Sequence, residues 1–318
     1  MLTPVLWPPN MAFWKDQSLQ KCLTASSEHR HLVRAERSSR ARAAYTLPTP
    51  EWSIAMTEAS PVGASSTRAQ SRNSGTFVLV HPAWFGGWCW KKVALLLRAR
   101  GYDVHTPTLT GLGDRAHLAR PEIGLNIHIE DITNFLNYEN LSGVVLVGNS
   151  SAGVVITGVA DRVPELIAHI VYLDAFVPQD GQSMLDIIPP DQRPRMEALV
   201  QQEGQGWLVP RFAPPPWEKL VPETWRITDE ADQRWVLPRL RPTPFGHFKE
   251  AVSRKNTAAE TLPRTYVRCL QWPNAVYDRY AEAAQRTPGW RYGELSTPHL
   301  PYITHPREVT DLLVEIIA

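Results

Sequence analysis

Residues 144–153, with the sequence Val-Val-Leu-Val-Gly-Asn-Ser-Ser-Ala-Gly, form the most informative segment of the chain. Its first four residues form an apolar run that is typical of a strand buried on both faces of a sheet. The small residues that follow favour a sharp turn, with a helix beginning at about Ala152. A serine at such a strand-to-helix turn is held in a strained conformation that projects its hydroxyl above the sheet. The stretch therefore predicts a nucleophilic serine at this turn.

The choice between the two adjacent serines follows from the close passage of strand and helix at the turn. The residues two before and two after the nucleophile must be small, and the usual pattern is Gly-x-Ser-x-Gly. Around Ser150 these residues are Gly148 and Ala152, whereas a nucleophile at Ser151 would place the larger Asn149 at the first position. Ser150 is therefore the predicted nucleophile, with one extra methyl at Ala152. The helix points its first amides at the turn, so the amide of Ser151 is a predicted oxyanion donor.

Strand and helix patterns alternate on both sides of this turn. Strands separated by helices indicate a mostly parallel sheet with helices on both faces. The expected strands are residues 76–80, 102–106, 143–147, 169–173, 265–269 and 291–295, and the expected helices are 90–99, about 127–136, 152–162 and 306–317.

The alternation stops at about residues 178–262. This stretch is rich in proline and contains four tryptophans, among them Trp207. It has too many aromatic residues for a disordered linker and too many prolines for sheet strands. We expect a helical cap inserted between two strands of a single domain at residues 76–318, forming an apolar roof over a pocket.

Residues 1–75 differ from the remainder, because they are rich in Ser, Arg, Ala, Thr and Pro and show no sustained periodicity. The stretch at 30–42 would suit an Arg-rich targeting arm, but the tail also contains acidic residues and tryptophans, which such arms avoid. We expect a disordered extension, or a start codon assigned too early with Met56 as the true start.

Composition limits the partners and the compartment. Charged residues make up 20% of the chain and the net charge is +1, so neither nucleic acid nor an anionic membrane is expected as a partner. No apolar run approaches the roughly 20 residues of a membrane-spanning helix, and no signal peptide is evident. Cys22, Cys89 and Cys269 are too few and too far apart for a disulfide framework, which favours a reducing, cytoplasmic location. No group of residues has metal-ligand spacing, so no metal or other cofactor is expected.

The loop after the first strand is the expected second wall of the site. Residues 81–90 have the sequence His-Pro-Ala-Trp-Phe-Gly-Gly-Trp-Cys-Trp. A loop at this position normally supplies a second oxyanion amide, which here is that of Ala83, since the preceding proline has no N–H. Trp84 and Cys89 are candidate pocket residues together with Trp207 of the cap. Packing is the alternative role for the tryptophans, and a small buried hydrophobe is the alternative for Cys89.

The catalytic base should be a histidine in the loop after the last strand. His299 lies there, whereas its rival His305 directly precedes a proline at a helix start. The acid in this arrangement commonly follows the strand at 265–269, yet no carboxylate occurs there before Asp278. Asp174, at the tip of the previous strand, is the preferred candidate because strand tips face the site. Asp278 or a dyad without an acid remain alternatives.

Residues 76–318 resemble the α/β-hydrolase family that includes plant methylesterases, hydroxynitrile lyases and bacterial esterases. Besides the serine turn, the resemblance rests on His81-x-x-Trp-x-Gly-Gly-Trp-x-Trp90 and on the stretches at residues 106–113, 156–164 and 172–178. Within the family, Gly87-Trp-Cys-Trp90 is similar to bacterial hydrolases of xenobiotic esters and carbamates, including carbendazim hydrolases, which cleave a benzimidazole methyl carbamate. Members of this family are often dimers, so the resemblance also implies that this chain can form a homodimer.

The resemblance implies a serine hydrolase of small carboxylic esters, carbamates or amides, with a small-molecule substrate. Hydroxynitrile lyases carry a lysine after the catalytic histidine, where this chain has Leu300, so a lyase is not favoured. Asn149 replaces the histidine usual before the nucleophile and Ser151 replaces a bulky residue after it, and both changes are expected to open the pocket mouth. A non-catalytic ligand receptor on the same fold is the alternative from another class.

Overall fold

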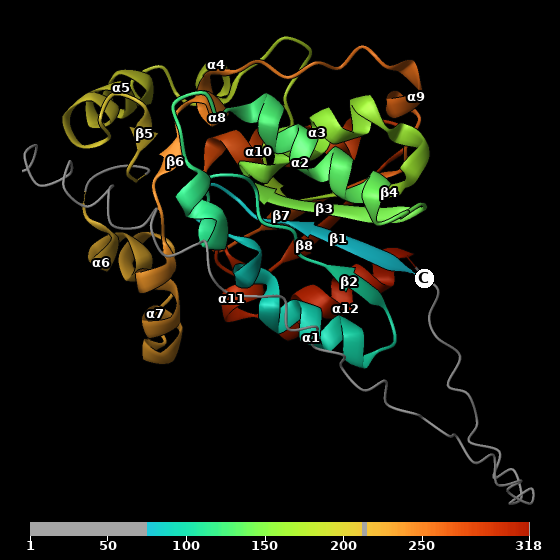
Figure 1. Cartoon of the computed structure of the whole chain (residues 1–318). Helices are drawn as coiled ribbons and strands as arrows, with labels where there is room; N and C mark the ends of the chain where they lie inside the picture. The colour runs from blue at the N-terminus through green and yellow to red at the C-terminus, as the bar shows by residue number, and fades with distance from the viewer. Residues whose placement is uncertain (1–74, 212–214, 318) are drawn as a thin grey trace, which may run out of the picture. The chain divides into compact units, whose positions relative to one another are not determined.

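The alternating strands form a six-stranded parallel sheet in the order β2-β1-β3-β4-β7-β8 (Figure 1). The computed structural model describes residues 75–211 and 215–317, so the predictions for the N-terminal extension, including Cys22 and Met56, lie outside the described residues. The strands are β1 (Thr76–Val80), β2 (Asp103–His105), β3 (Val144–Ser150), β4 (Ile167–Ala175), β7 (Arg264–Cys269) and β8 (Trp290–Leu295). The predicted α/β-hydrolase fold is confirmed.

The strand order places a crevice between two particular strands. From β1 the chain moves outward to β2 and then returns to β3 on the other side of β1. At such a reversal the loops after the two central strands diverge, which leaves room for a ligand at their carboxyl ends. The loop after β1 and the serine turn after β3 therefore face one another across this crevice.

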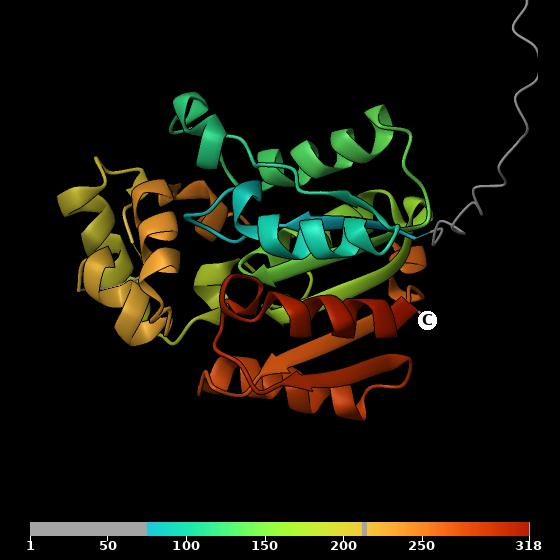
Figure 2. The same ribbon diagram turned by 90° about the horizontal axis from the view of Figure 1, so that it is seen from below.

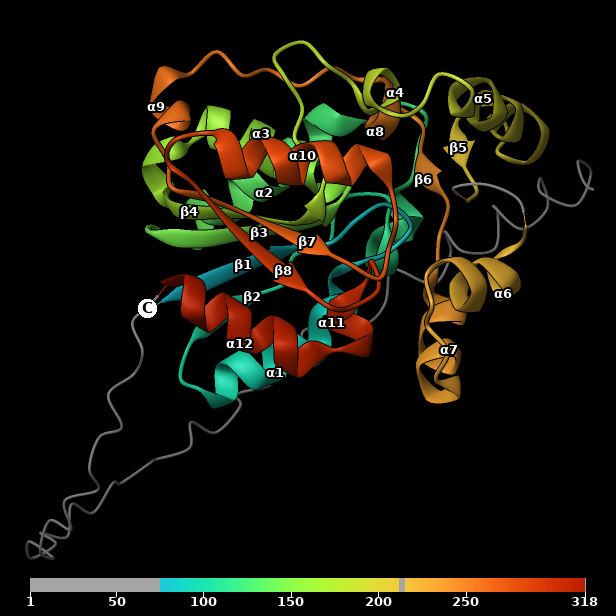
Figure 3. The same ribbon diagram turned by 180° about the vertical axis from the view of Figure 1, so that it is seen from behind.

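Two helical layers cover the sheet (Figures 1 and 3). One face is covered by α1 (Lys91–Ala99) and α12 (Pro306–Ile317), and the other by α2 (Leu125–Tyr138), α3 (Ala152–Arg162) and α10 (Ala275–Arg286). The predicted helices match these bounds closely, and α3 and α12 match at both ends. The helix α10 was not predicted. Its start is marked by Asn274, whose side chain accepts a hydrogen bond from the amide of Val276.

The segment between β4 and β7, called the insert below, holds mostly short helices. They are α4 (Met184–Ile187), α5 (Gln192–Glu203), α6 (Trp217–Lys219), a π-helical turn (Leu220–Thr224), α7 (Glu230–Val236), α8 (Gly246–Lys249) and α9 (Thr257–Glu260). A helical cap was expected here, and besides the helices the insert contains β5 (Leu208–Val209) and β6 (Thr243–Pro244), which form a short antiparallel pair. Figure 2 shows the yellow and gold part of the insert beyond the arrowheads of the sheet, at the carboxyl ends of the strands.

Trp84 anchors the insert to the loop after β1. Its indole ring lies 5.7 Å from that of Trp217 and 6.4 Å from that of Trp225, measured between ring centroids. The indole N–H donates to the carbonyl of Val209 in β5, and the backbone amide donates to the hydroxyl of Thr243 in β6. These partners come from separate parts of the insert, so Trp84 is one of the residues that hold the roof over the crevice against the core.

Candidate active site

Ser150 ends β3 with a backbone φ of +55°, a left-handed conformation that is strained for a residue with a side chain. Ser151 has an ordinary helical φ of −63° and begins the turn into α3. A Cβ atom on Gly148 would lie 2.9 Å from Ile156 Cδ1 and 3.1 Å from the Ala152 carbonyl oxygen, so the strand and the helix do pass too close for a larger residue. The strained geometry therefore falls on the serine that the flanking residues selected.

His299 and Asp174 lie side by side beneath this serine turn. The Nδ1 atom of His299 is 2.6 Å from Oδ2 of Asp174, and both side chains are buried. His299 comes from the loop between β8 and α11 (Pro301–Thr304), and Asp174 lies near the end of β4 with a left-handed φ of +45°. A carboxylate in this position holds the imidazole with Nδ1 protonated, which leaves Nε2 free to accept a proton.

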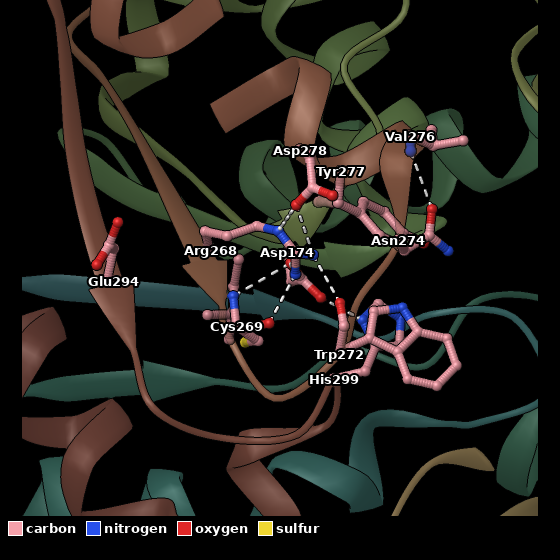
Figure 4. Close-up of polar contacts among 12 residues, drawn as sticks. Asp174, Arg268, Cys269, Trp272, Asn274, Val276, Tyr277, Asp278, Glu294 and His299 are labelled. Carbon is pink, nitrogen blue, oxygen red and sulfur yellow. Dashed lines mark hydrogen bonds and ion pairs between the residues drawn. The ribbon is translucent and has the colours of Figure 1, made fainter. Parts of the chain in front are cut away.

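The two rival residues lie elsewhere. The side chain of Asp278 is 54% exposed and pairs with the guanidinium of Arg268, with Oδ1 2.9 Å from Nε (Figure 4). The ring of His305 bonds to the hydroxyl of Thr304 directly before α12. Of the candidate acids, the structure thus brings Asp174 to His299, whereas Asp278 reaches the same cluster only through Arg268.

Two aromatic rings pack against the imidazole of His299. Trp272 stacks on it with a centroid distance of 5.2 Å, and the ring of Tyr277 lies 5.1 Å away. The Tyr277 hydroxyl is 3.4 Å from Oγ of Ser150. Burial, together with the negative charge of Asp174, raises the pKa of Tyr277 far above its ordinary value. The phenol therefore stays protonated and can donate a hydrogen bond beside Ser150.

The two predicted oxyanion residues are in direct contact, in an arrangement that the sequence did not suggest. The amide N–H of Ala83 donates to the side-chain hydroxyl of Ser151 at 2.7 Å, and both residues are buried. A substrate oxygen that is to receive the Ala83 hydrogen bond must therefore displace the Ser151 hydroxyl. Rotation of the Ser151 side chain about its Cα–Cβ bond would carry the hydroxyl away from this amide.

A pocket of about 730 Å³, counting space open to solvent, lies over these groups. Its lining is mostly aromatic and aliphatic, with a few polar groups on one side, as is usual for sites that bind small organic molecules. The lining residues are Pro82, Ala83, Trp84, Phe85, Ser150, Ser151, Phe176, Met184, Ile188, Pro189, Gln192, Met196, Trp225, Phe248, Trp272, Asn274, Val276, Tyr277, His299 and Leu300.

The structure places Trp84 in the pocket wall, but Cys89 and Trp207 are not among the lining residues. Cys89 is fully buried in the one-turn helix Gly87–Trp90, and burial raises the pKa of its thiol well above the ordinary value. Trp207 follows α5, and its carbonyl accepts a hydrogen bond from the amide of Phe245. Sequence reasoning missed the lining residues of α4 and α5, because a short proline-rich segment gives no periodicity from which an inward face can be chosen.

Asn149 does not open the pocket mouth, contrary to the expectation from the sequence. Its side chain is fully buried and donates to the carbonyls of Leu173, at 2.8 Å, and His299, at 3.1 Å. Its Oδ1 accepts a hydrogen bond from the hydroxyl of Tyr302. Asn149 thus ties the end of β3 to the loop that carries His299. Ser151, in contrast, does line the pocket.

Residues 75–211 and 215–317 contain no group of three or more His, Cys, Asp or Glu side chains placed to hold a metal ion. Within the same residues, no helix is both long and apolar enough to cross a membrane.

Comparison with known proteins gives the family. Residues 77–312 match the Alpha/beta hydrolase family, so the chain belongs to it, as its motifs predicted. A segment covering 38% of this chain is 49% identical to 50% of the carbendazim hydrolyzing esterase of Nocardioides sp. (strain SG-4G). Another, covering 42% of the chain, is 30% identical to 30% of the putative methylesterase 13, chloroplastic, of Arabidopsis thaliana. These matches span half or less of each relative.

A solved structure has the same fold over nearly its whole length. It is the extracellular alpha/beta-hydrolase from a Paenibacillus species, which superposes with a TM-score of 0.65 at 23% identity. The superposition covers 76% of this chain and 98% of the other. At this identity the likeness is one of fold.

Proposed function

We propose that this protein is a serine hydrolase that cleaves a small carboxylic ester, carbamate or amide through an acyl-enzyme. The observation that carries the proposal is the 2.6 Å contact between Asp174 and His299 beside the strained serine Ser150. Ser150 and His299 line the same pocket. A nucleophile, a base and a carboxylate that orients the base are the three parts that acyl transfer requires.

In the proposed reaction, Nε2 of His299 takes the hydroxyl proton of Ser150 as Oγ attacks the substrate carbonyl. The amides of Ala83 and Ser151 hold the oxyanion once the Ser151 hydroxyl has turned away. His299 then gives its proton to the leaving alcohol or amine, and Oγ retains the acyl or carbamoyl group. Water attacks this group with His299 again as base, which restores Ser150. Each oxyanion donor contributes on the order of 3 kcal/mol in the transition state.

The lining of the pocket supports an aromatic substrate. Trp84, Trp225 and Phe248 offer flat faces from the β1 loop and the insert, and Met184 and Met196 offer adaptable apolar contacts. One relative hydrolyses carbendazim by its name and others are methylesterases. We therefore include aromatic xenobiotics such as a benzimidazole methyl carbamate among the proposed substrates.

A fluorophosphonate probe tests the nucleophile directly, because it forms a stable bond only with an activated serine. We expect labelling of the wild type and of Ser151→Ala, and none of Ser150→Ala. The Ser151 variant is the matched control, since it removes the neighbouring hydroxyl. Absence of labelling in the folded wild type would contradict the proposal and favour a ligand receptor. A screen of p-nitrophenyl esters beside methyl carbamates, including carbendazim, then identifies the substrate class.

A further inference from the structure

Arg268 is a buried cation that contacts Asp174 at the carboxylate oxygen not bonded to His299, and its side chain is 3% exposed. Its Nη1 atom lies 2.7 Å from Oδ1 of Asp174, and its Nη2 atom lies 2.8 Å from Oδ1 of Asp278. The guanidinium also donates to the carbonyls of Cys269 and Trp272, both at 2.6 Å (Figure 4). Every nitrogen of the guanidinium therefore has a partner in the active-site region.

These contacts form a chain of alternating charge that begins at the base. His299 bonds to Oδ2 of Asp174, while Arg268 and the amide of Cys269 bond to Oδ1. Burial lowers the pKa of Arg268, but the carboxylates of Asp174 and Asp278 raise this pKa above its ordinary value. The guanidinium therefore remains charged. A cation this close to Asp174 partly cancels the negative charge that favours protonated His299.

Asp278 offsets that cation. With both carboxylates and the guanidinium ionised, the three groups together carry one negative charge, as a single acid would. The side chain of Asp278 is 54% exposed, and asparagine in its place keeps an oxygen that can accept from Nε of the buried Arg268. Its substitution therefore changes the charge near His299 with little effect on the packing.

The same guanidinium also holds the loop that contacts the imidazole. The Trp272 carbonyl accepts from Arg268, and the Trp272 ring stacks on His299. Arg268 thus connects the position of Asp174, on β4, to the position of Trp272, in the loop after β7. Arg268 therefore contacts both Asp174, which bonds to His299, and Trp272, whose ring stacks on His299.

We propose that Arg268 and Asp278 are positioning residues that extend the acid of the active site and determine the pH range in which His299 acts as a base. This inference rests on the proposed function of Ser150, His299 and Asp174. Because Arg268 and Asp278 carry opposite charges, their removal must shift the pH range of activity in opposite directions.

Other titratable groups around the cluster do not change charge near neutral pH. Burial raises the pKa of Tyr266 and Tyr277 well above the ordinary value, and raises the pKa of Tyr280 to about 12. On β8, burial and the neighbouring carboxylate of Glu294 raise the pKa of Tyr292 to about 12. Burial likewise raises the pKa values of Cys89, Cys269 and Tyr302. The charged groups of the cluster that are linked to His299 are therefore Asp174, directly, and Arg268 and Asp278 beyond it, while Glu294 is exposed on β8.

The test is the pH dependence of kcat/KM in the full chain, measured for the wild type, Asp278→Asn and Arg268→Gln. The substrate is a p-nitrophenyl ester that the wild type hydrolyses, and fluorophosphonate titration counts the active sites. We expect the acid limb of the profile to move to lower pH by roughly half a unit in Asp278→Asn, because protonated His299 loses a stabilising charge. In Arg268→Gln we expect it to move to higher pH, with a lower kcat because Asp174 and Trp272 are less firmly held.

Asp311→Asn is the matched control, since Asp311 is an aspartate on α12 that pairs with an arginine and is 64% exposed. Its profile should superimpose on that of the wild type. If the profile of Asp278→Asn also superimposes while its sites titrate fully, the proposal is overturned and the proposed function stands. If Arg268→Gln does not fold, the result for Asp278→Asn decides alone. If the folded wild type neither labels nor turns over, the proposed function fails and this inference fails with it.

Discussion

Replacement of Asp174 by asparagine is the perturbation whose consequence the structure defines most sharply. Both carboxylate oxygens accept hydrogen bonds: Oδ2 from His299, and Oδ1 from Arg268 and from the amide of Cys269. Asparagine is similar in size but has only one oxygen. In either orientation its NH₂ group therefore faces a donor in a fully buried position.

If the NH₂ group faces His299, it forces the imidazole into the tautomer with Nε2 protonated, which cannot accept the proton of Ser150. If it faces Arg268 instead, two donors oppose one another without water. We expect the first orientation to dominate and kcat to fall about 10³- to 10⁴-fold, which corresponds to roughly 4–5 kcal/mol in the activation free energy. The loss of a buried charge-assisted bond should also lower the free energy of unfolding by about 1–3 kcal/mol.

The assay is steady-state hydrolysis of a p-nitrophenyl ester at a pH on the plateau of the wild-type profile, with thermal unfolding to confirm folding. Asp311→Asn, which changes an exposed aspartate on α12 that also pairs with an arginine, is the matched control, and its kcat should equal that of the wild type. Asp278→Asn is measured beside it, and at that pH its kcat should stay within about threefold of the wild type. A folded Asp174→Asn protein that keeps more than a tenth of the wild-type kcat would refute the assignment of Asp174. A large loss in Asp278→Asn together with a small loss in Asp174→Asn would transfer the role to Asp278.

Two further predictions concern the oxyanion loop and the response to acid. Ser151→Ala removes the hydroxyl that engages the amide of Ala83, so kcat/KM should rise about 2- to 10-fold, as expected for release of one net hydrogen bond. A tenfold decrease would show instead that this hydroxyl stabilises the transition state. Burial lowers the pKa of His81 to about 4, and its Nε2 accepts from the amide of Leu109, so protonation of the folded state is opposed. The unfolded chain binds this proton below about pH 6.5, so stability is fully present above that pH and decreases by up to about 3 kcal/mol toward pH 4. Urea unfolding at several pH values measures this decrease. His81→Gln should reduce the slope of the unfolding free energy against pH by the equivalent of one proton, whereas the exposed control His117→Gln should leave the slope unchanged.

The parts of the fold that depend on neighbours in sequence were predictable. The small residues around Ser150 reflect a close approach between β3 and α3, which lie next to each other in the chain. The positive φ falls on the residue that this argument chose. The same holds for the alternating strands and helices, because each pattern reports on its own segment.

The walls of the pocket were less predictable for a physical reason. Cys89 is close to Ala83 in sequence, yet its side chain points into the core, because a turn of helix sends successive side chains in different directions. Met184 lies on α4, Ile188 directly follows that helix and Met196 lies on α5, and their inward orientation is decided by packing on the core.

The sequence alone indicates the layered α/β architecture, the position of the serine turn and two carboxylates that could serve as the acid. The tertiary structure was needed to show which of them lies against His299, because Asp174 and His299 are 125 residues apart and meet through the order of the strands. It also revealed that Arg268 joins Asp174 to Asp278, and that the hydroxyl of Ser151 engages the amide of Ala83. Hydrogen bonds and ion pairs depend on distances of a few ångströms, and a linear pattern carries no such distance between segments that are remote in the chain.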